Sequence, residues 1–254
     1  MVQDCWAPSR YVGDLGCSDD RDSEEDVDRK LGPRVDSRDF RSRYINRLTA
    51  SKVWVPPSQR PAKHQTVFIF DWDDTLLCTS WLQDHCDMKL DPTTTSQLAS
   101  IEKHALKMLT LAMSLGQTFI VTNADAGWVE HSAASWAPNL SSALSQVQIV
   151  SARNEYEDAY PYDINKWKVE AFLELQRNLP QPQVTNLIAL GDSEFEMVAA
   201  QKMRAKFEHA LLKTVKFQAK PSPWVMLKQM QLVSRNLGKI ASSAKNMRIL
   251  LERR

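Results

Sequence analysis

The chain has 254 residues, 43% of them apolar and 25% charged, so it can fill the core of one α/β domain and still carry charged tails. Its 32 basic and 31 acidic side chains nearly cancel, so the overall charge argues for neither a specific nucleic-acid-binding coat nor an acidic partner. The four cysteines show neither a paired metal-ligand spacing nor a dense disulfide framework, and no apolar run approaches the roughly 20 residues of a transmembrane helix.

Residues 1–62 combine mixed charge and several prolines with few clustered apolar side chains. This composition predicts a disordered, charged N-terminal tail and linker, because the segment cannot bury enough apolar surface to offset its ordering entropy. The acidic run within it is most simply a solvating tail, and the alternative is a docking segment for a basic protein partner. The first residues do not resemble a secretory signal, so we expect an intracellular, cytoplasmic protein.

Five short runs of apolar and β-branched residues predict buried strands. They are residues 66–70, 117–121, 147–150, 186–190 and 214–217. Helical stretches separate them, at residues 95–115, 127–145, 165–178 and 194–207. Strands that alternate with helices predict an α/β fold with a three-layer, doubly wound, Rossmann-like parallel sheet and helices on both faces. We assign residues 63–220 to this domain.

The sequence of residues 221–254 predicts a C-terminal helical extension with a basic end. Pro221 and Pro223 mark its start, an apolar face follows, and the end is basic. The simplest interpretation is one or two helices packed on the domain, with a frayed basic end. The alternative is that the basic end contacts an anionic surface or partner.

The residues that follow each strand are the candidates for function, because ligands of parallel α/β sheets bind at the carboxyl ends of the strands. The first strand leads into Asp71-Trp72-Asp73-Asp74-Thr75. Asp71 and Asp73 can face one substrate and one hard cation together. One carboxylate can attack phosphorus, and the other can protonate the leaving oxygen and later deprotonate water. Alone, the acidic stretch could equally be a turn or a helix cap.

The stretch from Val67 to Thr75 resembles the first signature of the haloacid dehalogenase superfamily, an apolar strand followed by Asp-x-Asp-x-Thr. The resemblance implies that Asp71 is the nucleophile and Asp73 the general acid/base. It also implies that the Asp71 carboxylate and the Asp73 backbone carbonyl bind Mg²⁺. Thr122, after the second strand, would then hold a phosphoryl oxygen, with backbone N–H groups from Asn123 onward completing the phosphate site.

The fourth strand ends in Gly191-Asp192-Ser193-Glu194-Phe195-Glu196, which resembles the fourth signature of the same family. Asp192 is then a direct Mg²⁺ ligand. The usual second acid is an aspartate four residues later, and here Glu196 occupies that place. Its longer side chain could reach the ion directly or through a water molecule. Glu194 is also present, and the sequence leaves open which glutamate completes the metal site.

The third signature of the family is a lysine before the fourth strand that neutralises the nucleophile and the phosphoryl group. Lys166 and Lys168 both qualify by distance along the chain. At about 100° per residue, Lys168 lies in the middle of the apolar stripe of its helix and Lys166 points almost opposite. A buried ammonium needs a partner, which the carboxylates would supply. The alternative is that Lys168 extends to solvent at the helix end.

The resemblance covers about residues 66–218 and implies a Mg²⁺-dependent phosphatase that works through an aspartyl-phosphate intermediate. The segments after the first two strands leave room for a hairpin flap but not for a folded cap, so we expect an open, capless site for a phosphorylated protein, another bulky substrate or a small molecule. Transfer to another acceptor is a further possibility. The alternatives are a pseudophosphatase that binds phosphorylated partners without turnover, and a scaffold that binds proteins through its tails.

Overall fold

The computed structural model describes residues 63–179 and 184–251, so the predicted N-terminal tail lies outside the described residues. Six parallel strands form one sheet in the order β3-β2-β1-β4-β5-β6. Their bounds are β1 (Thr66–Phe70), β2 (Gln117–Thr122), β3 (Gln148–Ser151), β4 (Asn186–Gly191), β5 (Leu211–Lys216) and β6 (Met247–Leu250). The sheet confirms the predicted parallel α/β fold.

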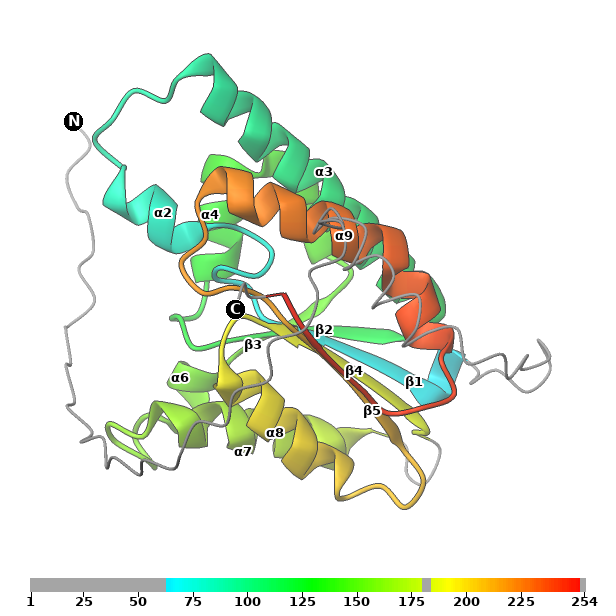
Figure 1. Cartoon of the computed structure of the whole chain (residues 1–254). Helices are drawn as coiled ribbons and strands as arrows, with labels where there is room; N and C mark the ends of the chain where they lie inside the picture. Colours follow the sequence, from blue (N-terminus) through cyan, green and yellow to red (C-terminus); the bar gives the residue numbers. More distant parts are fainter. Residues whose placement is uncertain (1–62, 180–183, 252–254) are drawn as a thin grey trace, which may run out of the picture.

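Helices cover both faces of the sheet (Figure 1). One face carries α2 (Thr79–Asp84), α3 (Pro92–Leu115), α4 (Trp128–Trp136), α5 (Ser141–Leu144) and α9 (Pro223–Ser242). The other face carries α6 (Ala152–Tyr156), α7 (Ile164–Asn178) and α8 (Glu194–Arg204). Two 3-10 turns, η2 (Lys63–Gln65) and η3 (Pro138–Leu140), complete the described elements. None of the helices in residues 63–179 and 184–251 has the length and apolar character needed to span a bilayer.

The strand β1 shows why the sheet needs a helical layer on each face. Phe68 and Phe70 join the core beneath α3, whereas Val67 and Ile69 join the core beneath α7. All five residues of β1 are buried. Because successive side chains of a strand point to opposite faces, a strand that is buried throughout must be covered on both sides.

Local signals explain where helix boundaries differ from the prediction. α3 begins at Pro92, earlier than expected, because the Asp91 side chain caps its first turn and proline is favoured at the first helical position. The single helix predicted over 127–145 is interrupted, since α4 ends at Trp136 and η3 begins at Pro138. Proline lacks the N–H that a continuous helix needs and clashes with the preceding turn.

No insertion domain interrupts the sheet within the described ranges. The segment between β1 and α3 forms the short helix α2 and a loop, rather than the expected hairpin flap. The segment between β2 and α7 contains α4, η3, α5, β3 and α6. The carboxyl edge of the sheet is therefore free of a cap in this part of the chain.

The C-terminal segment differs from the prediction. α9 is the expected packed helix, but the basic end is not a frayed continuation of it, because residues 247–250 form β6 and pair in parallel with β5. Met247 and Ile249 are buried while Arg248 and Leu250 are exposed. This alternation is the pattern of a strand covered on one face only.

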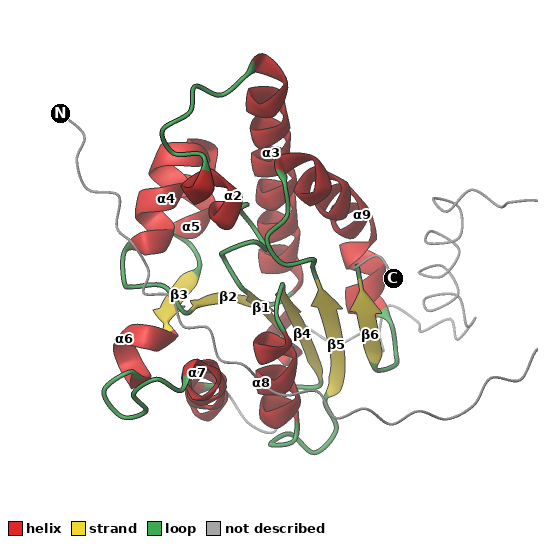
Figure 2. Ribbon diagram, turned by 60° about the vertical axis from the view of Figure 1, so that its left-hand side comes forward, coloured by secondary structure: helices red, strands yellow, loops and turns green. Residues whose placement is uncertain are grey.

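The connection into β6 also has an unusual hand. α8 links β4 to β5 and α9 links β5 to β6, so both connections run the same way across the sheet. The two helices nevertheless lie on opposite faces (Figure 2). The β5-α9-β6 connection therefore has the opposite hand to β4-α8-β5, although parallel crossovers almost always share one hand. Its position on the first face lets α9 pack along α3.

Candidate active site

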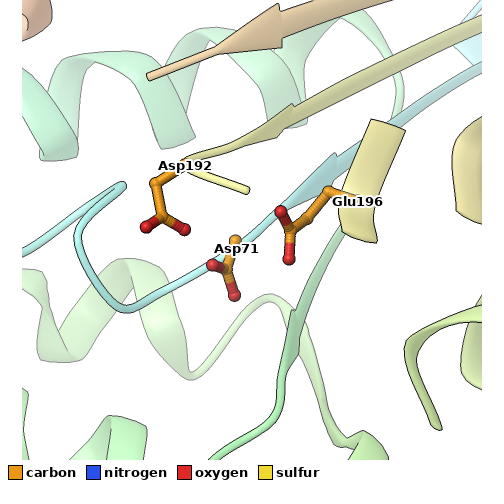
Figure 3. Close-up of side chains that lie close together, drawn as sticks. All are labelled: Asp71, Asp192 and Glu196. Carbon is orange, nitrogen blue, oxygen red and sulfur yellow. The ribbon is translucent and has the colours of Figure 1, made fainter. Parts of the chain in front are cut away.

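Three carboxylates meet at the carboxyl edge of the sheet (Figure 3). Asp71 follows β1, Asp192 follows β4, and Glu196 lies in the first turn of α8. One oxygen of each carboxylate lies within 4.8 Å of the others. Asp71 is 5% exposed and Glu196 is 3% exposed, so repulsion between these groups is weakly screened. Clustered carboxylate oxygens are the donor set that a hard cation such as Mg²⁺ prefers.

Lys168 supplies part of the positive charge that this carboxylate group needs. Its Nζ lies 2.7 Å from Asp71 Oδ1 and 2.8 Å from Glu196 Oε1, and the residue is 2% exposed. Lys166 points away, as the helical geometry predicts, and its Nζ lies 3.1 Å from Glu170 Oε1. One ammonium against three carboxylates leaves an excess of negative charge that a divalent cation would balance.

The electrostatics reflect that excess of negative charge. Burial raises the pKa of Asp71 well above its usual value, with Lys168 opposing the rise and Glu196 adding to it. Burial and the neighbouring Glu196 raise the pKa of Asp192 to about 7. Burial acts to lower the pKa of Lys168, but Asp71 and Glu196 hold it above its usual value. A cation among these groups would favour the ionised forms of both aspartates.

Glu196 behaves differently from the two aspartates. Burial acts to raise its pKa, but the attraction of Lys168 and the hydrogen bonds from Lys168 and Ser193 outweigh burial and leave the pKa lowered. The pKa of Glu196 is thus shifted in the opposite direction from the pKa values of Asp71 and Asp192.

The position of Glu196 depends on its own helix and on a glycine. The Ser193 N–H donates to Glu196 Oε2 at 3.0 Å as part of a capping box. A Cβ on Gly191 would lie 2.5 Å from Glu196 Cγ, so this glycine leaves the space that Glu196 occupies. Glu194 instead lies on the surface, 3.1 Å from Nη2 of Arg248. Of the two glutamates that the sequence left open, Glu196 is the one in the carboxylate group.

Asp73 and Thr122 lie beside the carboxylate group and contact each other. Thr122 Oγ1 donates to Asp73 Oδ2 at 3.1 Å and accepts the Ala124 N–H at 3.0 Å. The indole N–H of Trp128 donates to Asp73 Oδ1 at 2.8 Å. The Asp73 carboxylate is not one of the three grouped carboxylates, and its predicted metal contact uses the backbone carbonyl instead.

The sequence interpretation did not identify Trp128. It lies at the first position of α4, after the end of β2. Its position shortly after the second strand places it at the same edge of the sheet as Asp73. The position along the chain does not show, however, which way the Trp128 side chain points. Tryptophan also has an indole donor, which usually finds a partner when it is buried.

Two polar atoms in the same loops are buried without a hydrogen-bond partner in the described structure. They are Thr75 Oγ1, after Asp73 and Asp74, and Asn123 Oδ1, directly after Thr122. Such atoms are uncommon in folded proteins, because leaving a buried donor or acceptor unsatisfied costs about 1–3 kcal/mol. Both atoms lie in the loops that follow β1 and β2, the strands that lead into Asp71 and Thr122.

Asp74 joins two loops at this edge. Its Oδ1 accepts the Ser80 N–H at 3.1 Å, and its Oδ2 accepts the Lys220 N–H at 3.1 Å. Asp74 and Lys220 both have left-handed backbone conformations, with φ of 52° and 48°. That conformation disfavours residues other than glycine, although aspartate tolerates it better than most. The hydrogen bond from Lys220 ties the loop after β1 to the loop after β5, and the hydrogen bond from Ser80 ties the same loop to α2.

A pocket of about 550 Å³ lies away from the carboxylates. Its lining includes Gly116 and Gln117 at the start of β2, Gln148 at the start of β3, and Asn178 at the end of α7. In a parallel sheet the starts of strands lie at the opposite edge from their ends. The pocket is therefore separate from Asp71.

Comparison with known proteins identifies no relative of this chain. No protein-family model matches it, and searches of curated proteins and of solved structures find no significant match.

Proposed function

We propose that the chain is a Mg²⁺-dependent phosphatase that works through an aspartyl-phosphate intermediate. The observation that carries the proposal is the buried group of Asp71, Asp192 and Glu196, with Lys168 between Asp71 and Glu196. The resemblance of two strand-end motifs to signatures of the haloacid dehalogenase superfamily supports the same function.

The proposed reaction has two steps that use the same pair of aspartates. Asp71 attacks the phosphorus of a phosphate monoester, the bond from phosphorus to the leaving oxygen breaks, and Asp73 gives its proton to that oxygen. Ionised Asp73 then takes a proton from water. The resulting hydroxide attacks the phosphorus of the aspartyl phosphate, which releases phosphate and restores Asp71.

The remaining residues bind and orient the phosphoryl group. Lys168 and the Thr122 hydroxyl would contact its oxygens, together with backbone N–H groups after Thr122. Asp71, Asp192 and Glu196 would hold Mg²⁺ with the Asp73 carbonyl. When bound, the ion supplies positive charge that balances the carboxylates and the phosphoryl oxygens.

The substrate class follows from the absence of a cap in the described part of the chain. Only α2 and its loops separate β1 from α3. The site is therefore expected to accept a bulky phosphorylated substrate, such as a phosphoprotein. A smaller monoester would also enter an open site, so a small aryl phosphate is a suitable first probe.

The direct test is hydrolysis of an aryl phosphate with Mg²⁺, with EDTA, and in the Asp71→Asn variant. Wild type with Mg²⁺ is expected to release phosphate, and EDTA should abolish the activity. Asp71→Asn should lose activity by about a thousandfold or more, because the nucleophile is removed. Asp158→Asn is the matched control, since Asp158 is exposed on the loop after α6. Equal activity of wild type and Asp71→Asn would show that the proposed nucleophile is wrong.

One observation favours a second candidate, a pseudophosphatase that binds phosphorylated partners without turnover. Both Glu196 oxygens are engaged, Oε1 with Lys168 and Oε2 with Ser193. A metal ion must compete with these contacts for the glutamate. Calorimetric titration with Mg²⁺ separates the two candidates. Tight binding of a phosphopeptide with no measurable Mg²⁺ binding and no phosphate release would favour the pseudophosphatase.

A further inference from the structure

We propose that Trp128 is a positioning residue that holds Asp73 for proton transfer, and that Thr122 releases Asp73 when a phosphoryl group binds. The inference rests on the proposed phosphatase function, in which Asp73 protonates the leaving oxygen. It adds a residue that lies outside every strand-end motif of the sequence.

Two indole hydrogen bonds in opposite directions join α4 to the loop after β1. The Trp128 N–H, on α4, donates to Asp73 Oδ1 at 2.8 Å. The Trp72 N–H, in the loop, donates back to Ser132 Oγ on α4 at 2.9 Å. Gly127, which precedes α4, has φ of 85°, a left-handed conformation that glycine adopts at low cost. The start of α4 is thus built to bring an indole against Asp73.

An indole can only donate, and this property assigns separate roles to the two Asp73 oxygens. Oδ1 accepts the Trp128 N–H whether Asp73 is ionised or protonated. A proton on the Asp73 carboxyl therefore belongs on Oδ2. Trp128 in this way makes Oδ2 the oxygen that gives a proton to the leaving group and later takes one from water.

In the described structure Oδ2 is not free, because Thr122 donates to it at 3.1 Å. The Thr122 hydroxyl has a single proton, so it cannot donate to Asp73 and to a phosphoryl oxygen at the same time. When the hydroxyl turns to a bound phosphoryl group, Oδ2 is released while Oδ1 stays on Trp128. Binding of the group to be transferred would thus expose the proton-transfer oxygen without moving Asp73 away from the site.

The test uses Trp128→Phe, which keeps an aromatic ring and removes the donor. We compare kcat/KM for an alkyl phosphate, whose leaving group needs a proton, with kcat/KM for 2,4-dinitrophenyl phosphate, whose leaving group does not. In Trp128→Phe, kcat/KM for the alkyl ester is expected to fall by about tenfold to a hundredfold, and kcat/KM for the dinitrophenyl ester by about twofold at most. Trp136→Phe, the same change at the other end of α4, should leave both values within about twofold of wild type. If Trp128 had only a structural role, the substitution would lower kcat/KM for both esters by the same factor. That outcome would overturn the inference.

A second measurement does not depend on turnover. The indole ¹H–¹⁵N resonance of Trp128, assigned by its loss in Trp128→Phe, should move upfield in Asp73→Ala because its acceptor is gone. The Trp136 resonance should stay in place. If the chemical shift of the Trp128 resonance is unchanged in Asp73→Ala, the inference is overturned even if the wild type is a phosphatase. A wild type without phosphatase activity refutes the proposed function, and with it the proton-transfer role, even if the resonance responds.

Discussion

Two fully buried lysines, at opposite ends of the sheet, have different surroundings. Lys168 contacts the carboxylates of Asp71 and Glu196 at the carboxyl edge. Lys213, in β5, donates to the side-chain oxygen of Asn186 and to the Ala241 carbonyl at the end of α9. Burial lowers the pKa of Lys213 to about 8, whereas the two carboxylates outweigh burial at Lys168 and raise its pKa.

The comparison shows that burial of a charge does not by itself indicate a catalytic site. Lys213 bonds only neutral acceptors among the described residues, and one of them is a carbonyl in the last turn of a helix, where positive charge is favourable. This is a structural arrangement. Lys168 lies among groups that carry opposite charge and that remain partly unbalanced. Only the second environment is suited to hold a metal cation.

Among changes that test the comparison of the two lysines, the largest expected effect comes from removing the ammonium at the carboxyl edge. Lys168→Met should lower phosphatase activity by about a hundredfold or more, because it removes a charge that would bind the transferred phosphoryl group. It should also lower the unfolding free energy by about 3–5 kcal/mol, since two buried carboxylates lose their partner. Lys166→Met is the control and should change activity by about twofold at most. Phosphate release measures the activity, and urea unfolding measures the stability. Equal losses of activity in Lys168→Met and Lys166→Met would contradict the role assigned to Lys168.

A smaller effect is expected when Lys168 is kept and one of its partners is displaced. Gly191→Ala would place a Cβ 2.5 Å from Glu196 Cγ, so the glutamate must move. Activity should fall by about tenfold to a hundredfold, because small displacements in a catalytic site are costly. Gly238→Ala, within α9, is the matched control, since its Cβ would meet only Leu111 Cδ2 of α3, at 4.0 Å. Full activity of Gly191→Ala in a steady-state assay would show that the position of Glu196 does not matter.

The smallest effect on activity is expected at Lys213. Its folded pKa of about 8 lies below the unfolded value near 10.5. The unfolded state therefore binds more protons between these values, and unfolding free energy rises with pH in that window. From pH 8 to pH 10 the rise should be about 2 kcal/mol larger in wild type than in Lys213→Met. Urea unfolding at each pH measures the unfolding free energy of both proteins. If it changes with pH in the same way in wild type and in Lys213→Met, the lowered pKa of Lys213 is contradicted. The activity of Lys213→Met at pH 7 should differ from that of wild type by about twofold at most.

Most of the fold could be predicted because its signals are local. β1 is apolar from Val67 to Phe70 and is followed by acidic residues, and apolar runs that lead into polar residues recur in β2 and β4. β6 was missed because it has only four residues, lies within a basic stretch, and is a strand only through its pairing with β5. The break at Pro138 was visible in the sequence, but the apolar residues on both sides favoured one continuous helix.

The site could be predicted in part. Parallel strand ends meet at one edge, which brings Asp71 and Asp192 together, and helical periodicity orients Lys168. The choice of Glu196 over Glu194 depends on the space above Gly191, which no residue pattern records. The roles of these residues in catalysis stay predictions until the variants are measured.

The edge strand β6 also bears on how copies of the chain meet. β6 ends the sheet in the described part of the chain. An exposed edge can pair with a strand of another molecule, and short strands that carry charged side chains resist this. β6 is four residues long and carries Arg248, whose side chain is 56% exposed. We therefore expect a strand this short, with a charged side chain at its second position, to disfavour edge-to-edge pairing of the described sheet.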